Sequence, residues 1–265
     1  MSVTRHGMGL AGESLAALRR RVEEAADDAA LQRLAERLAA DPRGGAHALA
    51  RTAGRRLEER RRVARLLALR DRLVRAGARA VAGVDEVGVG PLAGPVVACA
   101  VVLSDAVDLP GLNDSKRLSP TARERLASAI REQALAVSVA AVPPRDVDRL
   151  NVYHAALEAM RRAVTGLAVP ADHLLVDART IPGVSAPQTA IVHGDAEDGC
   201  IAAASIVAKV ERDAMMCELH ARYPGYGFAR HKGYGTQEHL AALRRLGPSP
   251  VHRRSFAPVA QHCLP

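Results

Sequence analysis

The amino-acid sequence predicts an α/β domain that follows a small helical appendage. Apolar residues recur at helical spacing over roughly the first 76 residues, and from about residue 80 onward runs of β-branched residues alternate with amphipathic stretches. Strands and helices mixed in this order are typical of an α/β fold. A length of 265 residues suits one full-sized domain with an appendage.

The appendage, residues 1–76, is predicted to be helical. Apolar residues keep helical spacing over 14–39, a break containing Pro and Gly follows at 41–45, and the helical pattern resumes from 46 to about 75, just before Gly77. A segment of this size buries little apolar surface, so we expect it to be weakly stable alone.

The net charge of +8 is concentrated in one stretch. Residues 51–79 contain eleven Arg and three acidic residues, so this stretch carries the whole excess. A dense basic stripe is the electrostatic footprint of a surface that binds a polyanion. A solvated helix face in an arginine-rich chain has the same composition, and the sequence leaves both interpretations open.

The remainder of the chain carries the mixed pattern. Residues 80–87 and 94–103 are predicted to be two buried strands, because they are β-branched runs separated by a Gly-rich turn. Farther along we expect helices at 119–134, 151–167, 201–223 and 236–246, strands at 135–142 and 173–177, and an irregular tail.

Composition excludes several classes of protein. No run of about eighteen apolar residues occurs, so we expect no transmembrane helix and no membrane partner. The first residues lack the basic-then-apolar order of a secretory signal. The four cysteines show no C-x-x-C spacing, which favours buried thiols in a reducing cytoplasm over a disulfide framework or a zinc site. We therefore expect a cytoplasmic protein.

Asp85 and Glu86 are the most informative residues of the chain. They lie side by side in a segment whose flanks are overwhelmingly apolar. Burying an unpaired charge costs several kcal/mol, so a fold that keeps two adjacent acids there needs a cation. A divalent metal or an arginine is the usual choice, and we take a metal site as the first hypothesis.

Two further acids punctuate apolar runs. Asp177 ends the predicted strand 173–177, and Asp195 follows the strand-like residues 190–192. Functional side chains commonly lie at strand ends in α/β folds, although each acid alone is more simply explained as a strand-end or turn residue. With the Asp85–Glu86 pair, the set suits two divalent ions, which prefer oxygen ligands and promote phosphodiester hydrolysis.

Residues 88–93 also match the glycine fingerprint of dinucleotide-binding folds. The context argues against that function. The fingerprint should open a helix, whereas Pro95 and a valine-rich run follow, and the acids at 85 and 86 would repel a pyrophosphate.

The rare lysines mark further candidates. Lys116, Lys209 and Lys232 are the only lysines among 37 basic residues. Where arginine is the default, a retained lysine indicates a need for a compact point charge. We predict phosphate contacts for Lys116 and Lys232, whereas an internal hydrogen bond or ion pair explains Lys209 about as well.

The aromatic residues are equally concentrated. Five of the six lie in 223–256, either as the hydrophobic anchor of the C-terminal part or as a surface that faces nucleotides. We assign Phe228 and Phe256 to the core and a functional role to Tyr234.

A series of motifs carries a family resemblance. In chain order the matching segments are 84–97, 112–119, 174–178, 194–196, 201–210, 226–228, 231–236 and 252–259. Together they resemble the bacterial ribonuclease HII family over about residues 80–260. The appendage also resembles the N-terminal extension that some members of this family carry.

The resemblance implies a ribonuclease H-like fold, with a mixed central sheet flanked by helices, and a catalytic domain over 77–265 whose C-terminal helical part binds substrate. It implies an endonuclease that hydrolyses the RNA strand of RNA–DNA hybrids and cuts at ribonucleotides embedded in duplex DNA, in repair and in replication. Attack of water in line would leave a 3′-hydroxyl and a 5′-phosphate. The implied catalytic residues, which would hold two Mg²⁺ or Mn²⁺ ions, are Asp85, Glu86, Asp177 and Asp195.

Substrate choice would depend on the 2′-hydroxyl, the group that distinguishes RNA from DNA. The resemblance implies that the backbone of Gly88, Val89 and Gly90 contacts this hydroxyl and that Tyr234 packs on the sugar at the RNA–DNA junction. The chain departs from the family at Val89, where arginine is usual, and more mildly at His193, where many relatives have lysine. A lost charge-assisted contact is worth roughly 1.5–3 kcal/mol, so we expect weaker binding with the metal chemistry intact.

Two alternatives stay open. One is a non-catalytic or weakened hybrid-binding relative, because of Val89, although all four acids are retained. The other is a hydrolase of the same fold that acts only on DNA. We expect a monomer whose partner is nucleic acid, and the sequence points to no protein partner.

Overall fold

The structure is a computed structural model that describes residues 13–25 and 27–262. The chain divides after Arg65 into two compact units. Each unit has its own apolar core.

In its described residues, the first unit contains three helices: α1 (Leu15–Glu24), α2 (Asp28–Ala39) and α3 (Gly44–Leu66). Apolar side chains from all three form one core, in which Leu18, Leu31 and Leu38 are fully buried. The expected helical stretch 14–39 is therefore two helices. Asp27 separates them because its side chain accepts a hydrogen bond from the N–H of Ala30 and so caps α2.

The expected helix from 46 to about 75 is also divided. It ends at Leu66, and α4 (Ala68–Arg75) follows. The side chain of Arg70 is buried and donates to the carbonyl of Ser104 and to the carboxylate of Asp105. These contacts attach α4 to the second unit, so the division falls earlier than the expected boundary between residues 76 and 77.

The second unit is built on a mixed sheet of five strands in the order β3-β2-β1-β4-β5. Strand β1 pairs antiparallel with β2 and parallel with β4, which makes β1 the central strand. The strands are β1 (Val81–Val87), β2 (Val96–Leu103), β3 (Ala134–Val142), β4 (His173–Asp177) and β5 (Gln188–Ile191). All the strands expected from the sequence are present.

Helices surround this sheet. They are α5 (Pro120–Gln133), α6 (Pro144–Leu150), α7 (Val152–Thr165), α8 (Gly194–Glu197), α9 (Gly199–Arg222), α10 (Phe228–His231), α11 (Gln237–Leu246) and α12 (Ala257–Ala260), with a 3-10 turn at Pro224–Tyr226. The four expected helices are confirmed to within two residues at each end. The helices not predicted from the sequence are α6, α8, α10 and α12, the last of them in the tail expected to be irregular. Each has at most seven residues, which is too short to show a helical period.

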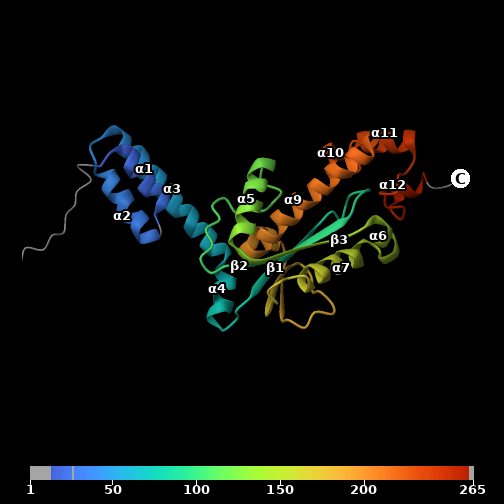
Figure 1. Ribbon diagram of the computed structural model, residues 1–265, viewed down its shortest axis with the longest axis horizontal. Coiled ribbons are helices and arrows are strands. Elements are labelled where there is room, and N and C mark those ends of the chain that lie inside the picture. Colours follow the sequence, from blue (N-terminus) through green and yellow to red (C-terminus); the bar gives the residue numbers. More distant parts are fainter. Residues whose placement is uncertain (1–12, 26, 263–265) are drawn as a thin grey trace, which may run out of the picture. The chain divides into compact units, whose positions relative to one another are not determined.

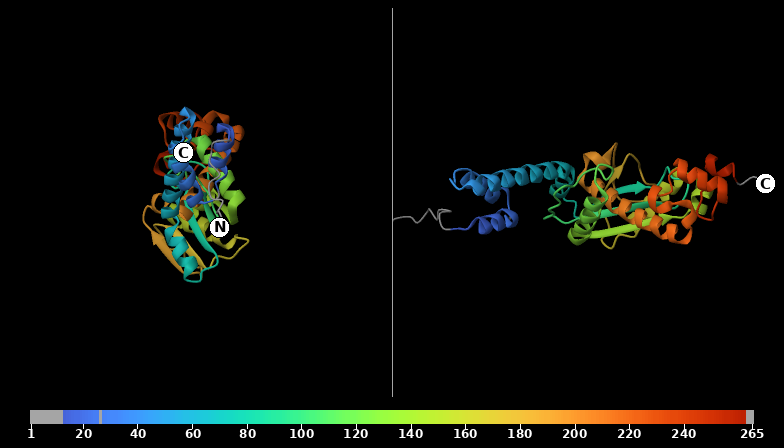
Figure 2. Two further views of the ribbon diagram at one scale, coloured as in Figure 1. Left: turned by 90° about the vertical axis from the view of Figure 1, so that its left-hand side faces the viewer. Right: turned by 90° about the horizontal axis from the view of Figure 1, so that it is seen from above.

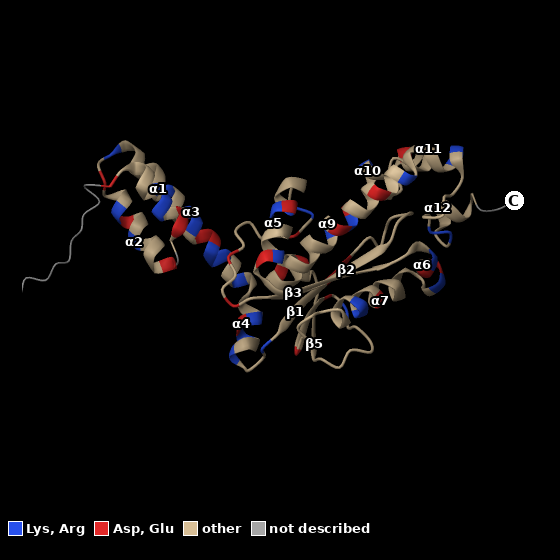
Figure 3. Ribbon diagram, in the orientation of Figure 1, with Lys and Arg blue, Asp and Glu red and all other residues tan. Residues whose placement is uncertain are grey.

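Helices α9 and α7 cover opposite faces of the sheet (Figures 1 and 2). Ala82 and Val84 of β1 belong to the apolar cluster that includes the buried face of α7. Gly83, between them, lies against the backbone of α9 at Cys200, where any side chain would collide. The strands are almost entirely free of charged residues (Figure 3), so the acids at the strand ends stand out.

The cysteines only partly follow expectation. Cys99 and Cys200 are buried thiols, as predicted, whereas Cys217 is exposed and accepts a hydrogen bond from Lys232 Nζ at 3.1 Å. Cys263 lies outside the described residues. Within the described ranges, no helix is long and apolar enough to cross a membrane.

Candidate active site

The parallel pairing of β1 and β4 brings two of the predicted acids together. Val84 pairs with Val176, so Asp85 and Asp177 come next along the two strands at the same edge of the sheet. The short helix α8 follows β5 and carries Asp195, and the N–H of Gly194 donates to Asp177 Oδ1 at 2.7 Å. Three segments far apart in the sequence therefore meet at one place.

Asp85 is the most deeply buried of the four acids, with 5 % of its surface exposed. Burial raises its pKa well above the ordinary value, and the charges of Glu86 and Asp177 add to the rise. A hydrogen bond from Ser205 of α9 opposes that rise. Ser205 also bonds the hydroxyl of Ser115 at 3.0 Å, which ties α9 to the loop before α5.

Glu86 has a cationic neighbour that the sequence pattern did not indicate. Arg179 Nη2 lies 3.1 Å from Glu86 Oε1. Burial raises the pKa of Glu86, while the charge of Arg179 lowers it. The second carboxylate oxygen, Oε2, is buried and has no hydrogen-bond partner among the described residues. An orphaned carboxylate oxygen in a buried position is an available ligand.

Lys116 adds a second positive charge to the site. Its Nζ lies 2.7 Å from Asp195 Oδ2, and this pairing is the main reason that the pKa of Lys116 is raised. The rest of the lysine side chain is largely exposed, whereas Asp195 is buried. The structure therefore places Lys116 among the acids and open to solvent, in reach of an incoming anion.

The residues present fit a hard divalent cation in their chemistry. All four acids supply oxygen, the ligand that Mg²⁺ and Mn²⁺ prefer, and the raised pKa values of Asp85 and Glu86 show that their charges lack full compensation. In the described part of the chain, however, no three acidic, His or Cys side chains already surround one metal position. Lys116 and Arg179 supply the positive charge instead.

The predicted substrate segment Gly88–Gly90 lies in the loop between β1 and β2. This loop leads into the antiparallel strand β2 and not into a helix. The structure therefore agrees with the prediction that the glycine fingerprint is not a dinucleotide-binding site. Gly88 has φ of +87°, a conformation that a side chain rarely adopts, and a Cβ there would collide with Arg212. Val89 is partly buried and packs against the α7-side cluster.

Two fully buried arginines hold this loop, and sequence reasoning missed both. Arg253 donates to the carbonyls of Gly88, Val89 and Gly94 at 2.6–3.0 Å. Arg212 donates to the carbonyls of Ala93 and Pro95 in the same loop, and to the carbonyl of Lys232. Neither forms an ion pair within the described ranges, and burial lowers the pKa of Arg253 to about 9. In an arginine-rich chain neither charge nor spacing distinguished these two from surface residues, although Arg253 lies in the matching segment 252–259.

Tyr234 lies beside the glycine loop, as a substrate-facing role requires. The tyrosine is 45 % exposed, and a Cβ placed on Gly90 would be 3.7 Å from its Cε1. The N–H of Leu92 donates to Gly233 at 2.8 Å, which joins the two segments. Phe228 is fully buried as predicted, while Phe256 is only partly buried.

Lys232 is not brought into the acid cluster. Its Nζ contacts Cys217, and the residue lines a groove of about 440 Å³ formed by α5, α9 and α10. Lys209 forms an ion pair with Asp213 one turn along α9, at 2.6 Å. The internal explanation of Lys209 is therefore confirmed.

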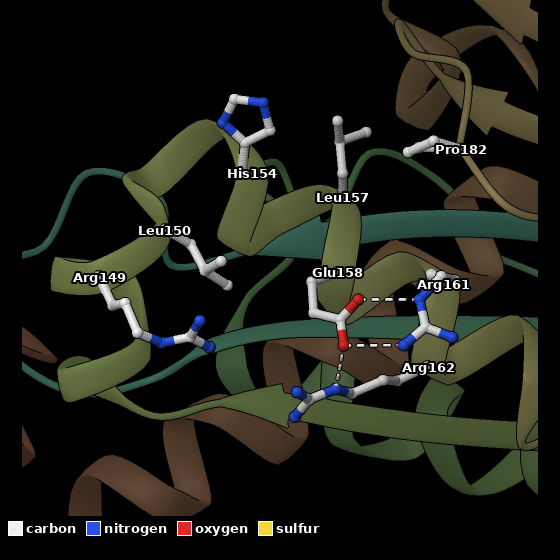
Figure 4. Close-up of a pocket in the computed structure, with 8 residues that line it drawn as sticks. All are labelled: Arg149, Leu150, His154, Leu157, Glu158, Arg161, Arg162 and Pro182. Carbon is white, nitrogen blue, oxygen red and sulfur yellow. Dashed lines mark hydrogen bonds and ion pairs between the residues drawn. The ribbon is translucent and has the colours of Figure 1, made fainter.

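A separate pocket of about 350 Å³ lies on α7 and includes none of the four acids. Three arginines line it, and two of them, Arg161 and Arg162, share the carboxylate of Glu158 (Figure 4). The guanidinium groups there are already paired, in contrast to the incomplete pairing at Glu86.

Comparison with known proteins identifies the family of the chain. The model of the family described as ribonuclease HII matches residues 82–259. A ribonuclease HII of Myxococcus xanthus is 54 % identical over 233 residues, which cover 86 % of this chain and 80 % of the relative.

Solved structures share the fold. A crystal structure of the ribonuclease H2 from Pyrococcus horikoshii OT3 superposes with a TM-score of 0.60 at 27 % identity, over 69 % of this chain and 96 % of that one. A ribonuclease HIII, Bst-RNase HIII, solved in complex with Mn²⁺, superposes with a TM-score of 0.50 at 19 % identity, over 71 % and 70 % of the two chains. The chain thus has the ribonuclease H-like fold and belongs to the ribonuclease HII family of endoribonucleases, which act on RNA–DNA hybrids.

Proposed function

We propose that this chain hydrolyses the RNA strand of RNA–DNA hybrids, and cuts at single ribonucleotides embedded in duplex DNA, by a two-metal-ion mechanism. The observation that carries this proposal is the convergence of Asp85, Glu86, Asp177 and Asp195 at one edge of the sheet, from three separate segments. The products would carry a 3′-hydroxyl and a 5′-phosphate.

The four acids are the proposed ligands of two Mg²⁺ or Mn²⁺ ions. When bound, such ions activate water and stabilise the charge that develops on the phosphodiester. Asp85 and Glu86 are buried with raised pKa values, so binding a divalent cation supplies the compensation that they lack. That a relative of the same fold was solved with Mn²⁺ is consistent with this assignment.

The chain's own cations would position the substrate. Lys116 pairs with Asp195 while its side chain stays 77 % exposed, so its ammonium group can contact a phosphate at the rim of the acid cluster. Lys232 would contact the nucleic-acid backbone farther away, along the groove that it lines. Both roles are electrostatic and require no covalent intermediate.

The Gly88–Gly90 loop is the segment proposed to recognise the 2′-hydroxyl of the ribonucleotide. Arg253 fixes the carbonyls of Gly88 and Val89, which leaves a rigid backbone beside an exposed tyrosine ring, that of Tyr234. Preorganised backbone groups discriminate a hydroxyl without having to reorganise when the substrate binds. The sugar of the ribonucleotide would lie between this loop and Tyr234.

Cleavage assays with three labelled duplexes test the proposal. They are an RNA–DNA hybrid, a DNA duplex with one ribonucleotide and a matched all-DNA duplex, each with Mg²⁺ or Mn²⁺. We expect cleavage of the first two, with ends that polynucleotide kinase and ligase identify as 5′-phosphate and 3′-hydroxyl. Asp177→Asn is the matched inactive control.

Each rival has its own outcome. Binding without cleavage under both metals would establish the non-catalytic relative, for which Val89 is the motive. Cleavage of the all-DNA duplex without cleavage at ribonucleotides would establish the hydrolase that acts only on DNA. Either result would overturn the proposed function.

A further inference from the structure

Arg179 is attached to the acid cluster by an incomplete ion pair. A guanidinium group and a carboxylate can form two parallel hydrogen bonds, but here only one nitrogen approaches one oxygen, at 3.1 Å. Arg179 Nη1 and Glu86 Oε2 are both buried and without a hydrogen-bond partner among the described residues. A pair that leaves a donor and an acceptor unused loses much of its stabilisation, so each member can exchange for a better partner.

Tyr153 gives the guanidinium a second support. The central carbon of the Arg179 guanidinium lies 5.1 Å from the centre of the tyrosine ring, within the range of a cation–π contact. Tyr153 is in the first turn of α7 and is 53 % exposed, and its ring meets that of His154 edge-on. This contact does not involve Glu86, so Arg179 keeps one support when Glu86 is otherwise engaged.

The backbone directs Arg179 to the same edge of the sheet as the acids. Ala178 has φ of +50°, which is uncommon for a residue with a Cβ, and its N–H donates to the carbonyl of Ile191 at 2.9 Å. Left-handed non-glycine residues persist where the surrounding structure enforces them, and they concentrate at functional sites. Here the turn sets the course of the chain between Asp177 and Arg179.

We propose that Arg179 is a phosphate ligand for the substrate strand. It rests on Glu86 while the protein is free of metal, and it pairs with a phosphodiester next to the scissile one once a divalent ion engages Glu86. The inference rests on the proposed function. A guanidinium fork matches two phosphate oxygens as well as it matches a carboxylate, and Tyr153 holds it in place in both states.

The salt dependence of hybrid binding tests this exchange. Full-length wild type, Arg179→Gln and Arg161→Gln are titrated with an RNA–DNA hybrid in Ca²⁺, with gels confirming that the hybrid stays uncut. Each phosphate contact contributes about 0.9 to the slope of log K against log salt. We expect Arg179→Gln to weaken binding and to reduce the slope by about one.

Arg161→Gln is the matched control, because its guanidinium also pairs with a glutamate but is committed to Glu158 by two hydrogen bonds (Figure 4). It should leave the slope unchanged. Tyr153→Phe keeps the ring face and should behave as wild type, whereas Tyr153→Leu should lose part of the slope. Tyr153→Leu changes an exposed side chain, so it tests the same contact independently of the folding of Arg179→Gln.

Metal binding to the protein alone provides the second readout. Calorimetry with Mn²⁺ and no nucleic acid should show several-fold tighter binding to Arg179→Gln than to wild type, because a cation that competes for Glu86 is gone. Unchanged slope in both Arg179→Gln and Tyr153→Leu would overturn the proposal, as would an equal loss of slope in Arg161→Gln. Failure of the proposed function would look different, since wild type itself would then leave the hybrid uncut in both Mg²⁺ and Mn²⁺, whatever the slopes measured in Ca²⁺.

Discussion

The side chains of Asp85 and Glu86, near the end of β1, point to opposite faces of the sheet. Gly83, two positions before Asp85, lies against α9, while Val84, two positions before Glu86, belongs to the cluster that includes α7. Side chains alternate along a strand, so the two adjacent acids face the two different helices. The charge of Asp177 raises the pKa of both carboxyl groups, so Asp85 and Glu86 belong to one site although they face different helices.

Removing the charge of Asp85 should cost activity and increase stability. Asp85→Asn keeps the shape of the side chain but gives up a buried negative charge whose pKa is raised by burial. We expect cleavage to fall at least about a hundredfold and the Tm in chelator to rise by about 2–4 °C, for a gain of about 1 kcal/mol. Glu218→Gln, at an exposed position of α9, should change neither. Loss of both activity and Tm would contradict this account.

Arg253 should control the substrate loop through its hydrogen bonds. Arg253→Lys keeps the positive charge but cannot reach three carbonyls with one ammonium group. We expect a loss of about 2–4 kcal/mol in the free energy of unfolding, since buried carbonyls lose their donors, and a higher KM with a smaller change in kcat. Denaturant unfolding and steady-state kinetics measure the two effects. Unchanged KM in a destabilised protein would restrict Arg253 to a structural role.

Two hydrogen-bonded neutral histidines, His239 and His252, support the backbone of Tyr234. His239 Nδ1 lies 2.9 Å from the carbonyl of Tyr234, and His239 Nε2 lies 3.0 Å from His252 Nε2. If His239 donates to the carbonyl through Nδ1, its Nε2 must accept from His252, whose Nδ1 then accepts from Ser249. Protonating either ring would place two N–H groups face to face. His231, which stacks on His239, adds a further repulsive charge if it is protonated.

The contribution of His252 to stability should therefore fall in acid. Burial lowers the pKa of His252 from 6.5 to about 4, with the neighbouring His239 contributing. Because the folded state disfavours the proton, this stability is complete above about pH 6.5 and is lost as the pH falls toward 4, by about 3 kcal/mol. Unfolding measured from pH 4.5 to 7.5 checks this. His252→Gln should flatten the dependence, whereas the same change at His47, exposed on α3, should not.

The sequence predicted the parts of the fold that depend on local pattern. The central strands are continuous apolar runs, and the acids at positions 85, 177 and 195 interrupt or end such runs, so local pattern was enough to locate both. Their meeting at one edge depends on the parallel register of β1 with β4. That register is a long-range property which no local pattern contains.

The supporting arginines could not be predicted, for a different reason. Arg179, Arg212 and Arg253 look like any other basic residue in a chain with 37 of them. What distinguishes them is burial and the carbonyls or carboxylate that they meet. The break between α3 and α4 at Leu67 could not be predicted either, because the helical spacing of apolar residues continues through it.

The exposed arginines of α3 should add non-specific affinity for the duplex. Within the described ranges, Arg51, Arg55, Arg61 and Arg65 are exposed, form no ion pair or hydrogen bond, and share one face of the helix at their spacing. Basic residues recur along this helix (Figure 3). Changing all four to Gln should raise KM and reduce the salt slope by about one to four units.

The matched control for α3 is Arg33→Gln with Arg37→Gln on the exposed face of α2. This double variant should keep the wild-type slope. An unchanged slope in the quadruple α3 variant would leave the basic stripe as a solvated helix face. Losses of slope in proportion to the four and two charges removed would assign the binding to the charge of the first unit as a whole.

Val89→Arg should strengthen the recognition of single ribonucleotides embedded in duplex DNA. Val89 lies between the two glycines of the loop and packs only partly against the core, while Arg253 holds its carbonyl. An arginine there loses little packing, keeps the backbone position and gains a cation beside the substrate. A charge-assisted contact is worth roughly 1.5–3 kcal/mol, or about ten- to a hundredfold in kcat/KM. Assays on a DNA duplex with one ribonucleotide measure the gain, and Val89→Leu controls for side-chain size. Equal kcat/KM for wild type and Val89→Arg would show that the loop reads its substrate through the backbone alone.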